Sequence, residues 1–91
     1  MLHVIAYDIP DDGRRVKVAE VLKDFGRRVH YSVFEALLDA ELLDQLRHRV
    51  QRIIDAEEDS VRIYRLCGEC EAKVVVIGMG ERTLEPKVYV V

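Results

Sequence analysis

Residues 2–15 constrain the fold more than any other stretch, because they indicate a strand, a turn and a helix start in direct succession. The run Leu2–Tyr7 is apolar, too short for a buried helix and rich in strand-forming residues. Asp8 follows where this strand ends, and Pro10 lacks the N–H group that a strand ladder needs. The next two residues suit the N-terminal cap of a helix: Asp11 and Asp12. The stretch therefore predicts a carboxylate between the end of a strand and the start of a helix.

Both faces of this first strand are largely apolar, which is typical of a central strand with helices on one side. By alternation, Asp8 shares a face with Val4 and Ala6 at the carboxyl end of the strand. Two interpretations of Asp8 remain open. It could be a turn residue that caps the following helix, or a functional carboxylate at a position where functional groups are common.

The composition indicates one small folded domain, residues 1–91, that would gain stability from a partner subunit. Hydrophobic residues make up 49% of the chain and charged residues 34%, which argues against disorder. No apolar run approaches the roughly 20 residues that cross a bilayer, and no export signal is recognisable. We therefore expect a cytoplasmic protein without membrane contact. The net charge of −3 means that any contact with nucleic acid must come from a local basic patch.

The predicted first helix spans residues 12–25, where Val18, Leu22 and Phe25 form one apolar stripe. Gly26 follows directly and suits the left-handed conformation that often closes a helix. We therefore expect the helix to end there and to pack its stripe against the sheet.

Basic residues cluster at both ends of this helix: Arg14, Arg15 and Lys17 in its first turns, Arg27 and Arg28 beyond its end. Free backbone N–H groups at a helix start, together with two arginines, predict phosphate binding. The alternative is a set of solvated charges balanced by neighbouring acidic residues. A helix of this length is roughly 20 Å long, so the two clusters would bracket a length of nucleic-acid backbone or meet across a dimer axis.

The run Val29–Leu38 is extended, but its hydrophobic alternation blurs from Phe34 onward. Such a change of phase predicts either one strand with a kink or bulge, or two short strands. His30 has no Cys or His at ligand spacing, so a cross-strand hydrogen bond is favoured over a metal site. Phe34 suits a position in the core.

Asp39 is predicted to cap a second helix with a strong apolar stripe. The stripe consists of Leu42, Leu43, Leu46, Val50, Ile53 and Ile54. The arginines on the polar side of this helix are interpreted as solvated charges: Arg47, Arg49 and Arg52. The run Val61–Leu66 predicts the strand that follows.

Cys67 and Cys70 form a single C-x-x-C motif. A zinc ion needs four ligands, so a zinc site here would need the cysteines of two subunits. A redox pair at a helix start is possible, but inert thiols in a loop are favoured because spacing alone is a weak signal. Farther on, Lys73–Gly78 predicts a buried strand. The apolar Val88–Val91 predicts a short strand that must join a sheet edge, its own or that of a partner.

The predicted order is strand, helix, one or two strands, helix, strand, strand. Two helices that can cover one face of an antiparallel sheet fit an α+β sandwich of ferredoxin-like type. The short apolar segment at the C-terminus adds an extra strand to that plan.

Four pieces of the sequence together resemble the small CRISPR-associated proteins of Cas family two. They are Tyr7-Asp8-Ile9, then Asp11-Asp12 with Arg15 and Val18-Ala19, then Tyr31-Ser32-Val33-Phe34-Glu35, and then Ser60-Val61-Arg62-Ile63-Tyr64. The resemblance extends over essentially all 91 residues and implies a ferredoxin-like homodimer with the sheets of two subunits facing each other. It implies a Mg²⁺-dependent endonuclease of RNA or double-stranded DNA. It also implies a structural role at the centre of the complex with the CRISPR integrase that captures new spacers.

When the functional positions of the family are transferred to this sequence, the resemblance implies that Asp8 is the metal-binding and catalytic residue. It places nucleic-acid contacts at Arg15, Arg28 and the aromatic Phe34. Lys17 falls where other members can have arginine, and it keeps the charge but loses bidentate phosphate geometry. Arg14, next to Arg15, is expected to join the same nucleic-acid surface.

One carboxylate in each chain is too few for most two-metal nucleases. In a two-fold dimer, however, Asp8 and its symmetry mate could face each other across the axis. Mg²⁺ commonly takes one or two carboxylates and completes its shell with water and phosphate oxygens. No second candidate for a general base stands out in the sequence. A non-catalytic scaffold, on which the same basic residues bind duplex DNA and the integrase docks, therefore remains the rival interpretation.

Overall fold

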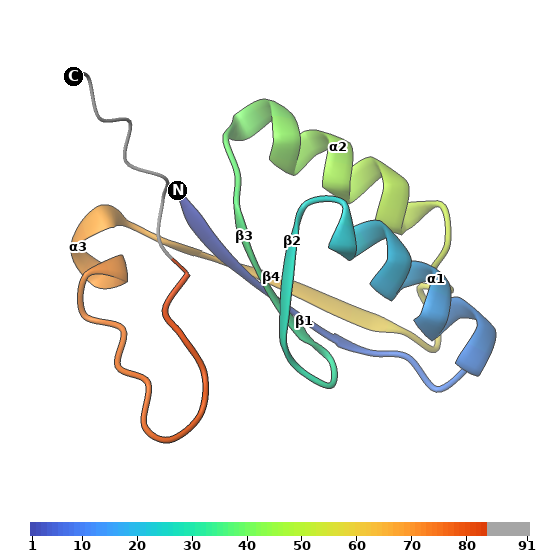
Figure 1. The fold of residues 1–91 in the computed structure, drawn as a ribbon. Coiled ribbons are helices and arrows are strands. Elements are labelled where there is room, and N and C mark those ends of the chain that lie inside the picture. Colours follow the sequence, from blue (N-terminus) through green and yellow to red (C-terminus); the bar gives the residue numbers. More distant parts are fainter. Residues whose placement is uncertain (84–91) are drawn as a thin grey trace.

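The computed structural model describes residues 1–83 and has the predicted α+β architecture. Four antiparallel strands form one sheet in the order β2-β3-β1-β4. The helices α1 and α2 lie side by side on one face of this sheet (Figure 1). The elements in chain order are β1 (Leu2–Asp8), α1 (Asp12–Lys23), β2 (Gly26–His30), β3 (Val33–Leu37), α2 (Ala40–Gln51), β4 (Ser60–Leu66) and α3 (Gly68–Glu71).

The strand β1 is central, as predicted, because it pairs with β3 on one side and with β4 on the other. Its residues Ile5 and Tyr7 point toward the helices and belong to the hydrophobic core. Phe34 from β3 and Leu22 from α1 pack in the same core. The alternation of side chains then puts Asp8 on the opposite face of the sheet, at the carboxyl end of β1.

Side-chain caps start both long helices. The Asp11 carboxylate accepts a hydrogen bond from the Arg14 backbone N–H at 2.8 Å, and the Asp39 carboxylate accepts one from the Leu42 N–H at the same distance. Each cap satisfies an N–H group that has no partner within its helix. The helix α1 ends at Lys23, two residues before the predicted end, and Phe25 packs against the core from beyond it.

The extended run after α1 is two strands, which was one of the two predicted alternatives. The strands β2 and β3 form a hairpin that turns at Tyr31 and Ser32, and a bulge lies between Arg28 and His30. The alternation predicted across residues 29–33 is therefore wrong, because the chain reverses direction within it. The turn contains no glycine, proline or asparagine, so the sequence carries no strong signal for a turn here.

Gly26 has a different role from the predicted helix-closing one. Within residues 1–83, positive φ angles occur at Gly78 and Gly80, and Gly26 has none. Gly26 is instead the first residue of β2, and a Cβ atom built there would lie 2.1 Å from the Glu35 backbone oxygen. The glycine is required because β2 and β3 approach each other closely at this point.

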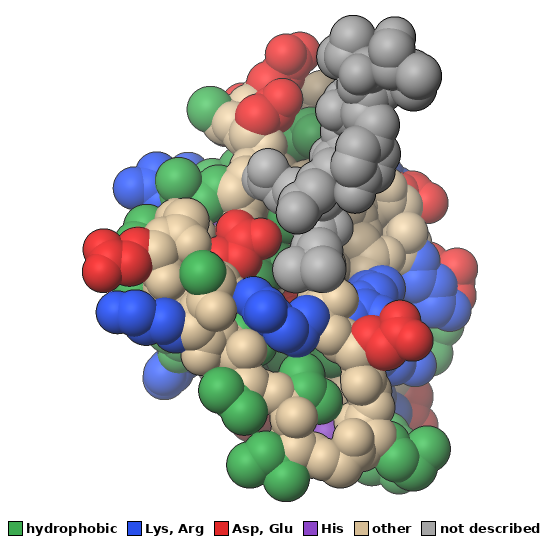
Figure 2. Space-filling view, turned by 60° about the vertical axis from the view of Figure 1, so that its left-hand side comes forward, with side chains coloured by type: hydrophobic (Ala, Val, Ile, Leu, Met, Phe, Trp, Pro, Cys, Tyr) green, Lys and Arg blue, Asp and Glu red, His purple; other side chains and the backbone are tan. Residues whose placement is uncertain are grey.

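The predicted strand at residues 73–78 is wrong. After α3 the chain forms no strand in this segment, and the side chains of Val75, Ile77 and Met79 are exposed. The apolar run predicted burial, but residues 73–78 pair with neither edge strand of the sheet, β2 or β4. The chain instead returns to the hairpin, where Arg27 Nε donates a hydrogen bond to Thr83 Oγ1 at 2.9 Å. Figure 2 shows hydrophobic side chains at the surface on this end of the molecule.

The predicted strand Val88–Val91 lies outside the described residues and stays a prediction. Among residues 1–83, every helix is too short or too polar to span a lipid bilayer.

The close approach at Gly26 predicts that Gly26→Ala destabilises the fold. The new methyl group would meet the Glu35 carbonyl at 2.1 Å and Ala36 Cβ at 2.7 Å, so β2 would have to shift. We expect a loss of about 1–3 kcal/mol in the free energy of unfolding, measured by urea denaturation. Gly68→Ala is the matched control, because nothing lies within 4 Å of a Cβ there. Equal stability of the two variants would contradict this account of Gly26.

Candidate metal and nucleic-acid site

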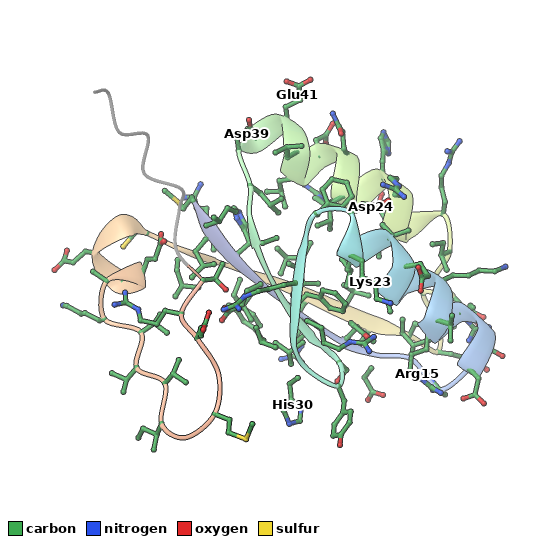
Figure 3. The ribbon with its side chains drawn as sticks, viewed as in Figure 1. Arg15, Lys23, Asp24, His30, Asp39 and Glu41 are labelled. Carbon is green, nitrogen blue, oxygen red and sulfur yellow. The ribbon has the colours of Figure 1, made fainter. Side chains whose placement is uncertain are left out.

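A cavity of about 570 Å³ opens between α1 and the β2–β3 hairpin, at the carboxyl end of β1. Basic and acidic side chains line it together with the hairpin turn. The lining residues that matter for chemistry are Asp8, Arg15, Glu20, Lys23, Arg28 and Tyr31. Figure 3 shows that Arg15 and Lys23 both come from α1. Arg15 and Lys23 are eight positions apart, which places them on the same side of a helix.

Asp8 is exposed and is the last residue of β1, opposite Ser60 of β4. Among residues 1–83, no cationic side chain pairs with its carboxylate. An exposed carboxylate without an internal cation is available to a cation from solution. Asp8 does not cap the helix, because Asp11 does so. The capping interpretation of Asp8 is therefore wrong.

Arg15 is held against the turn that joins β1 to α1. Its Nη1 donates a hydrogen bond to the Ile9 backbone oxygen at 3.1 Å, and its Nη2 pairs with the Asp12 carboxylate. The side chain is still 43% exposed, so it keeps surface for a further anion. These bonds fix the guanidinium near the end of β1, because the turn itself is tied to the buried Ile9.

Arg28 reaches the cavity from β2, and its guanidinium lies over the Phe34 ring at 5.3 Å from the ring centre. Within the part of the chain that the structure describes, no carboxylate pairs with Arg28. The cation–π contact orients the side chain without neutralising its charge.

Phe34 itself is fully buried, with 0% of its surface exposed. The expectation that this ring contacts nucleic acid is wrong for this structure, because no part of it is accessible to a base. Its contribution to the site is indirect, as the surface on which Arg28 rests.

Arg14 pairs with two acidic side chains and does not line the cavity, so its predicted place on the nucleic-acid surface stays a prediction. Its Nε donates to Asp59 Oδ2 at 2.8 Å, and its Nη2 donates to Glu58 Oε2 at 2.9 Å. The hydrogen bond from Arg14 holds the pKa of the Asp59 carboxyl below its usual value, and the same bond raises the pKa of Arg14. This network joins the start of α1 to the loop before β4, so its role is structural.

The basic residues that line the cavity differ from the predicted set at two positions. Lys17 is exposed but does not line the cavity, whereas Lys23 does. Lys23 also pairs with Glu20 at 3.2 Å. Its eight-residue spacing from Arg15 on α1 is the signal that could have found it.

Cys67 and Cys70 lie away from this cavity. They follow Leu66, which pairs with Leu2, whereas Asp8 is at the opposite end of β1. Both thiols are free and exposed, and Cys67 directly precedes the short helix α3. The backbone N–H and the thiol of Cys70 lower the pKa of Cys67.

The described residues offer few ligands to a metal ion. Among residues 1–83, no group of three or more His, Cys, Asp or Glu side chains is arranged to hold a metal. Of the two carboxylates that line the cavity, Glu20 pairs with Lys23, so Asp8 is the one left for a metal ion. This fits Mg²⁺, which accepts one or two carboxylates and fills its remaining positions with water and phosphate oxygens.

The family model described as CRISPR associated protein Cas2 matches residues 1–74. The chain belongs to the Cas2 family. The chain is 51% identical over 79 residues to the CRISPR-associated endonuclease Cas2 2 of Thermus thermophilus, covering 87% of this chain and 83% of that protein. It is 47% identical over 91 residues to the CRISPR-associated endoribonuclease Cas2 3 of Chloroflexus aurantiacus, covering 100% of this chain and 98% of that protein.

Solved Cas2 structures have the same fold. The crystal structure of Streptococcus pyogenes Cas2 at pH 6.5 superposes with a TM-score of 0.75 at 31% identity, over 86% of this chain and 100% of that chain. A chain of a partial Cas6-RT-Cas1–Cas2 complex superposes with a TM-score of 0.73 at 29% identity, over 84% of this chain and 89% of that chain. The ferredoxin-like expectation for the Cas2 fold is confirmed.

The Arg14 network predicts a pH-dependent loss of stability in Arg14→Met. The pKa of Asp59 in the folded protein lies below its ordinary value of 3.8, so the carboxylate stabilises the fold fully above pH 3.8. That contribution disappears as the pH falls through the lowered pKa. Urea denaturation should show a clear destabilisation at neutral pH that shrinks steadily below pH 3.8.

Arg49→Met is the control for this experiment, because the Arg49–Asp24 pair is also 2.8 Å long but its two side chains are 44% and 60% exposed. An exposed pair contributes little, so this variant, which also loses the contact of Arg49 with the Phe25 ring, should lose little stability and the loss should not change with pH. An Arg14→Met variant as stable as wild type at neutral pH would contradict the structural role of the network.

Proposed function

We propose that this Cas2-family chain binds the phosphate backbone of nucleic acid at the cavity and cleaves it with Mg²⁺ held by Asp8. The observation that carries this proposal is one cavity that joins an exposed, unpaired carboxylate to two arginines, Arg15 and Arg28. Carboxylate oxygens bind hard cations, and guanidinium groups bind phosphate. The names of the two relatives, endonuclease and endoribonuclease, support the reaction class.

The single carboxylate supports a site shared by two copies of the chain. In a homodimer, the Asp8 residues of two subunits would both face one ion. The face of the sheet opposite α1 and α2 suits such an arrangement, since Asp8 lies on it. Val4 and Ala6 on the same face are half-buried, and Tyr64 beside Val4 is 49% exposed. This apolar surface supports contact between the sheets of two subunits.

The residues of this chain would divide the reaction between them. Arg15 and Arg28 would hold the phosphate whose ester bond is cut, and their charge would stabilise the extra negative charge of the transition state. Asp8 would fix the position of the cation relative to that phosphate. Mg²⁺, when bound, supplies Lewis-acid activation of a phosphate oxygen and of a water molecule.

A second candidate function is a scaffold that binds duplex DNA without cutting it. Two observations favour it: residues 1–83 hold no group of three or more side chains arranged to bind a metal ion, and a similar chain occurs in a complex that contains Cas1. In this role, Arg15 and Arg28 would grip the backbone in the same way, and the CRISPR integrase would dock elsewhere on the dimer during spacer acquisition.

The nuclease proposal predicts that Asp8→Asn abolishes cleavage of RNA or duplex DNA. The amide keeps the shape of the side chain but removes the negative charge that binds the cation. Cleavage by wild type should also stop when Mg²⁺ is chelated. Activity that survives either treatment would refute the proposed role of Asp8. Spacer acquisition in cells that carry Asp8→Asn separates the two functions, because normal acquisition would support the scaffold.

Nucleic-acid binding through the cavity predicts that Arg15→Ala combined with Arg28→Ala weakens binding to every sequence alike. Contacts to phosphate carry no sequence information, and each lost contact should flatten the dependence of affinity on salt. Fluorescence anisotropy over a salt series measures both effects. Arg47→Ala on α2 is the matched control, because Arg47 is exposed but does not line the cavity. Wild-type affinity and salt slope in the double variant would exclude this cavity as the interface.

A further inference from the structure

The hairpin turn places a large aromatic side chain in solvent at the rim of the cavity. Tyr31 is 87% exposed, which makes it the most exposed aromatic residue among those described. Its neighbour His30, also exposed, meets it edge-on, with ring centres 5.2 Å apart and planes at 78°. Figure 3 shows His30 on the hairpin. Neither ring contributes to the hydrophobic core of residues 1–83, so packing among these residues does not explain the presence of the two rings.

The backbone beneath Tyr31 is anchored to the core. The Tyr7 hydroxyl donates a hydrogen bond to the Tyr31 backbone oxygen at 3.2 Å, and the Tyr7 N–H donates one to the Ser32 oxygen at 3.0 Å. Tyr7 is itself buried, and its ring lies 6.3 Å from that of Phe34. These hydrogen bonds hold the turn against the central strand β1, so the backbone that carries the exposed Tyr31 ring has a fixed position.

Tyr31 also lies close to the groups that would hold phosphate. It lines the same cavity as Asp8, Arg15 and Arg28. A second, more open hollow of about 430 Å³ is formed by Arg28, Val29, His30 and Tyr31. An exposed aromatic ring beside arginines is the combination with which proteins bind single-stranded nucleic acid, since bases stack on the ring while cations hold the backbone.

We propose that Tyr31, supported by His30, is a stacking platform for one unpaired nucleobase. The inference rests on the proposed function, because it takes the phosphate of that nucleotide to lie at Arg15 and Arg28. A base inside a duplex is already stacked between its neighbours and cannot lie on a protein ring. The platform therefore selects single-stranded segments or the frayed end of a duplex.

The test measures the affinity of three probes: a short single-stranded RNA, the same strand with abasic positions, and a blunt duplex of the same length. Tyr31→Ala should weaken binding of the intact strand about tenfold or more. It should leave the affinity for the abasic strand and for the duplex unchanged. Tyr31→Phe keeps a ring and should bind the intact strand as wild type does. Leu42→Ala, which removes exposed apolar surface outside both hollows and no ring, is the matched control.

Each other outcome has a definite meaning. If Tyr31→Ala binds the intact strand as well as wild type does, the stacking platform is refuted while the proposed function stands. If it loses affinity equally for all three probes, or changes the sedimentation coefficient of the protein, the ring acts through folding or through a protein contact, and the inference is again refuted. If wild type binds none of the probes, the proposed function itself fails.

Discussion

The strand β1 is hydrogen-bonded on both sides, to β3 and to β4, and the rest of the structure depends on this double pairing. One face of β1 supplies Ile5 and Tyr7 to the core, and the end of the strand presents Asp8. Tyr7 also holds the hairpin turn through two hydrogen bonds. A single rigid element thus sets the position of the carboxylate, of the cavity and of Tyr31. Rigid support of this kind is what a site for a cation and a phosphate requires.

The arginines of the molecule separate into two groups by their partners. Arg14 is neutralised by Glu58 and Asp59 and holds α1 to the loop before β4. Arg28 rests on a ring and has no carboxylate partner among residues 1–83, so its charge remains available. Arg15 is intermediate, since it pairs with Asp12 but stays 43% exposed. Of these three side chains, Arg28 therefore has the most charge available to a phosphate and Arg14 the least.

Local signals in the sequence were sufficient for much of the fold. The apolar run before Asp8, the caps Asp11 and Asp39, and the stripe of α2 predicted elements that the structure confirms. Such features depend on residues close together in the chain. Gly26 and the strand expected at 73–78 were misread because their environment comes from distant partners. Neither the close approach of Gly26 to Glu35 nor the lack of pairing between residues 73–78 and an edge strand can be predicted from the local sequence pattern.

The candidate site was predictable to a similar extent. Asp8, Arg15 and Arg28 were chosen from the sequence, and the structure brings them to one cavity. Arg14 and Phe34 were also chosen, but the first is paired and the second is buried. The charge and the aromatic character of a residue can be read from a sequence. Its ion-pair partners and its solvent exposure depend on the folded structure. Tyr31 could not have been separated from a strand residue before the hairpin turn was known.

The proposed position of the cation, at Asp8 on the end of β1, can be measured by paramagnetic broadening with Mn²⁺. In NMR spectra of the folded protein, Mn²⁺ in place of Mg²⁺ broadens backbone amide signals close to its binding site. If Asp8 holds the ion, the amide signals of Asp8, Ile9 and Ser60 should broaden selectively in wild type. The same signals should not broaden in Asp8→Asn. Broadening that persists in Asp8→Asn, or that centres on the acidic loop at residues 57–59, would contradict the account.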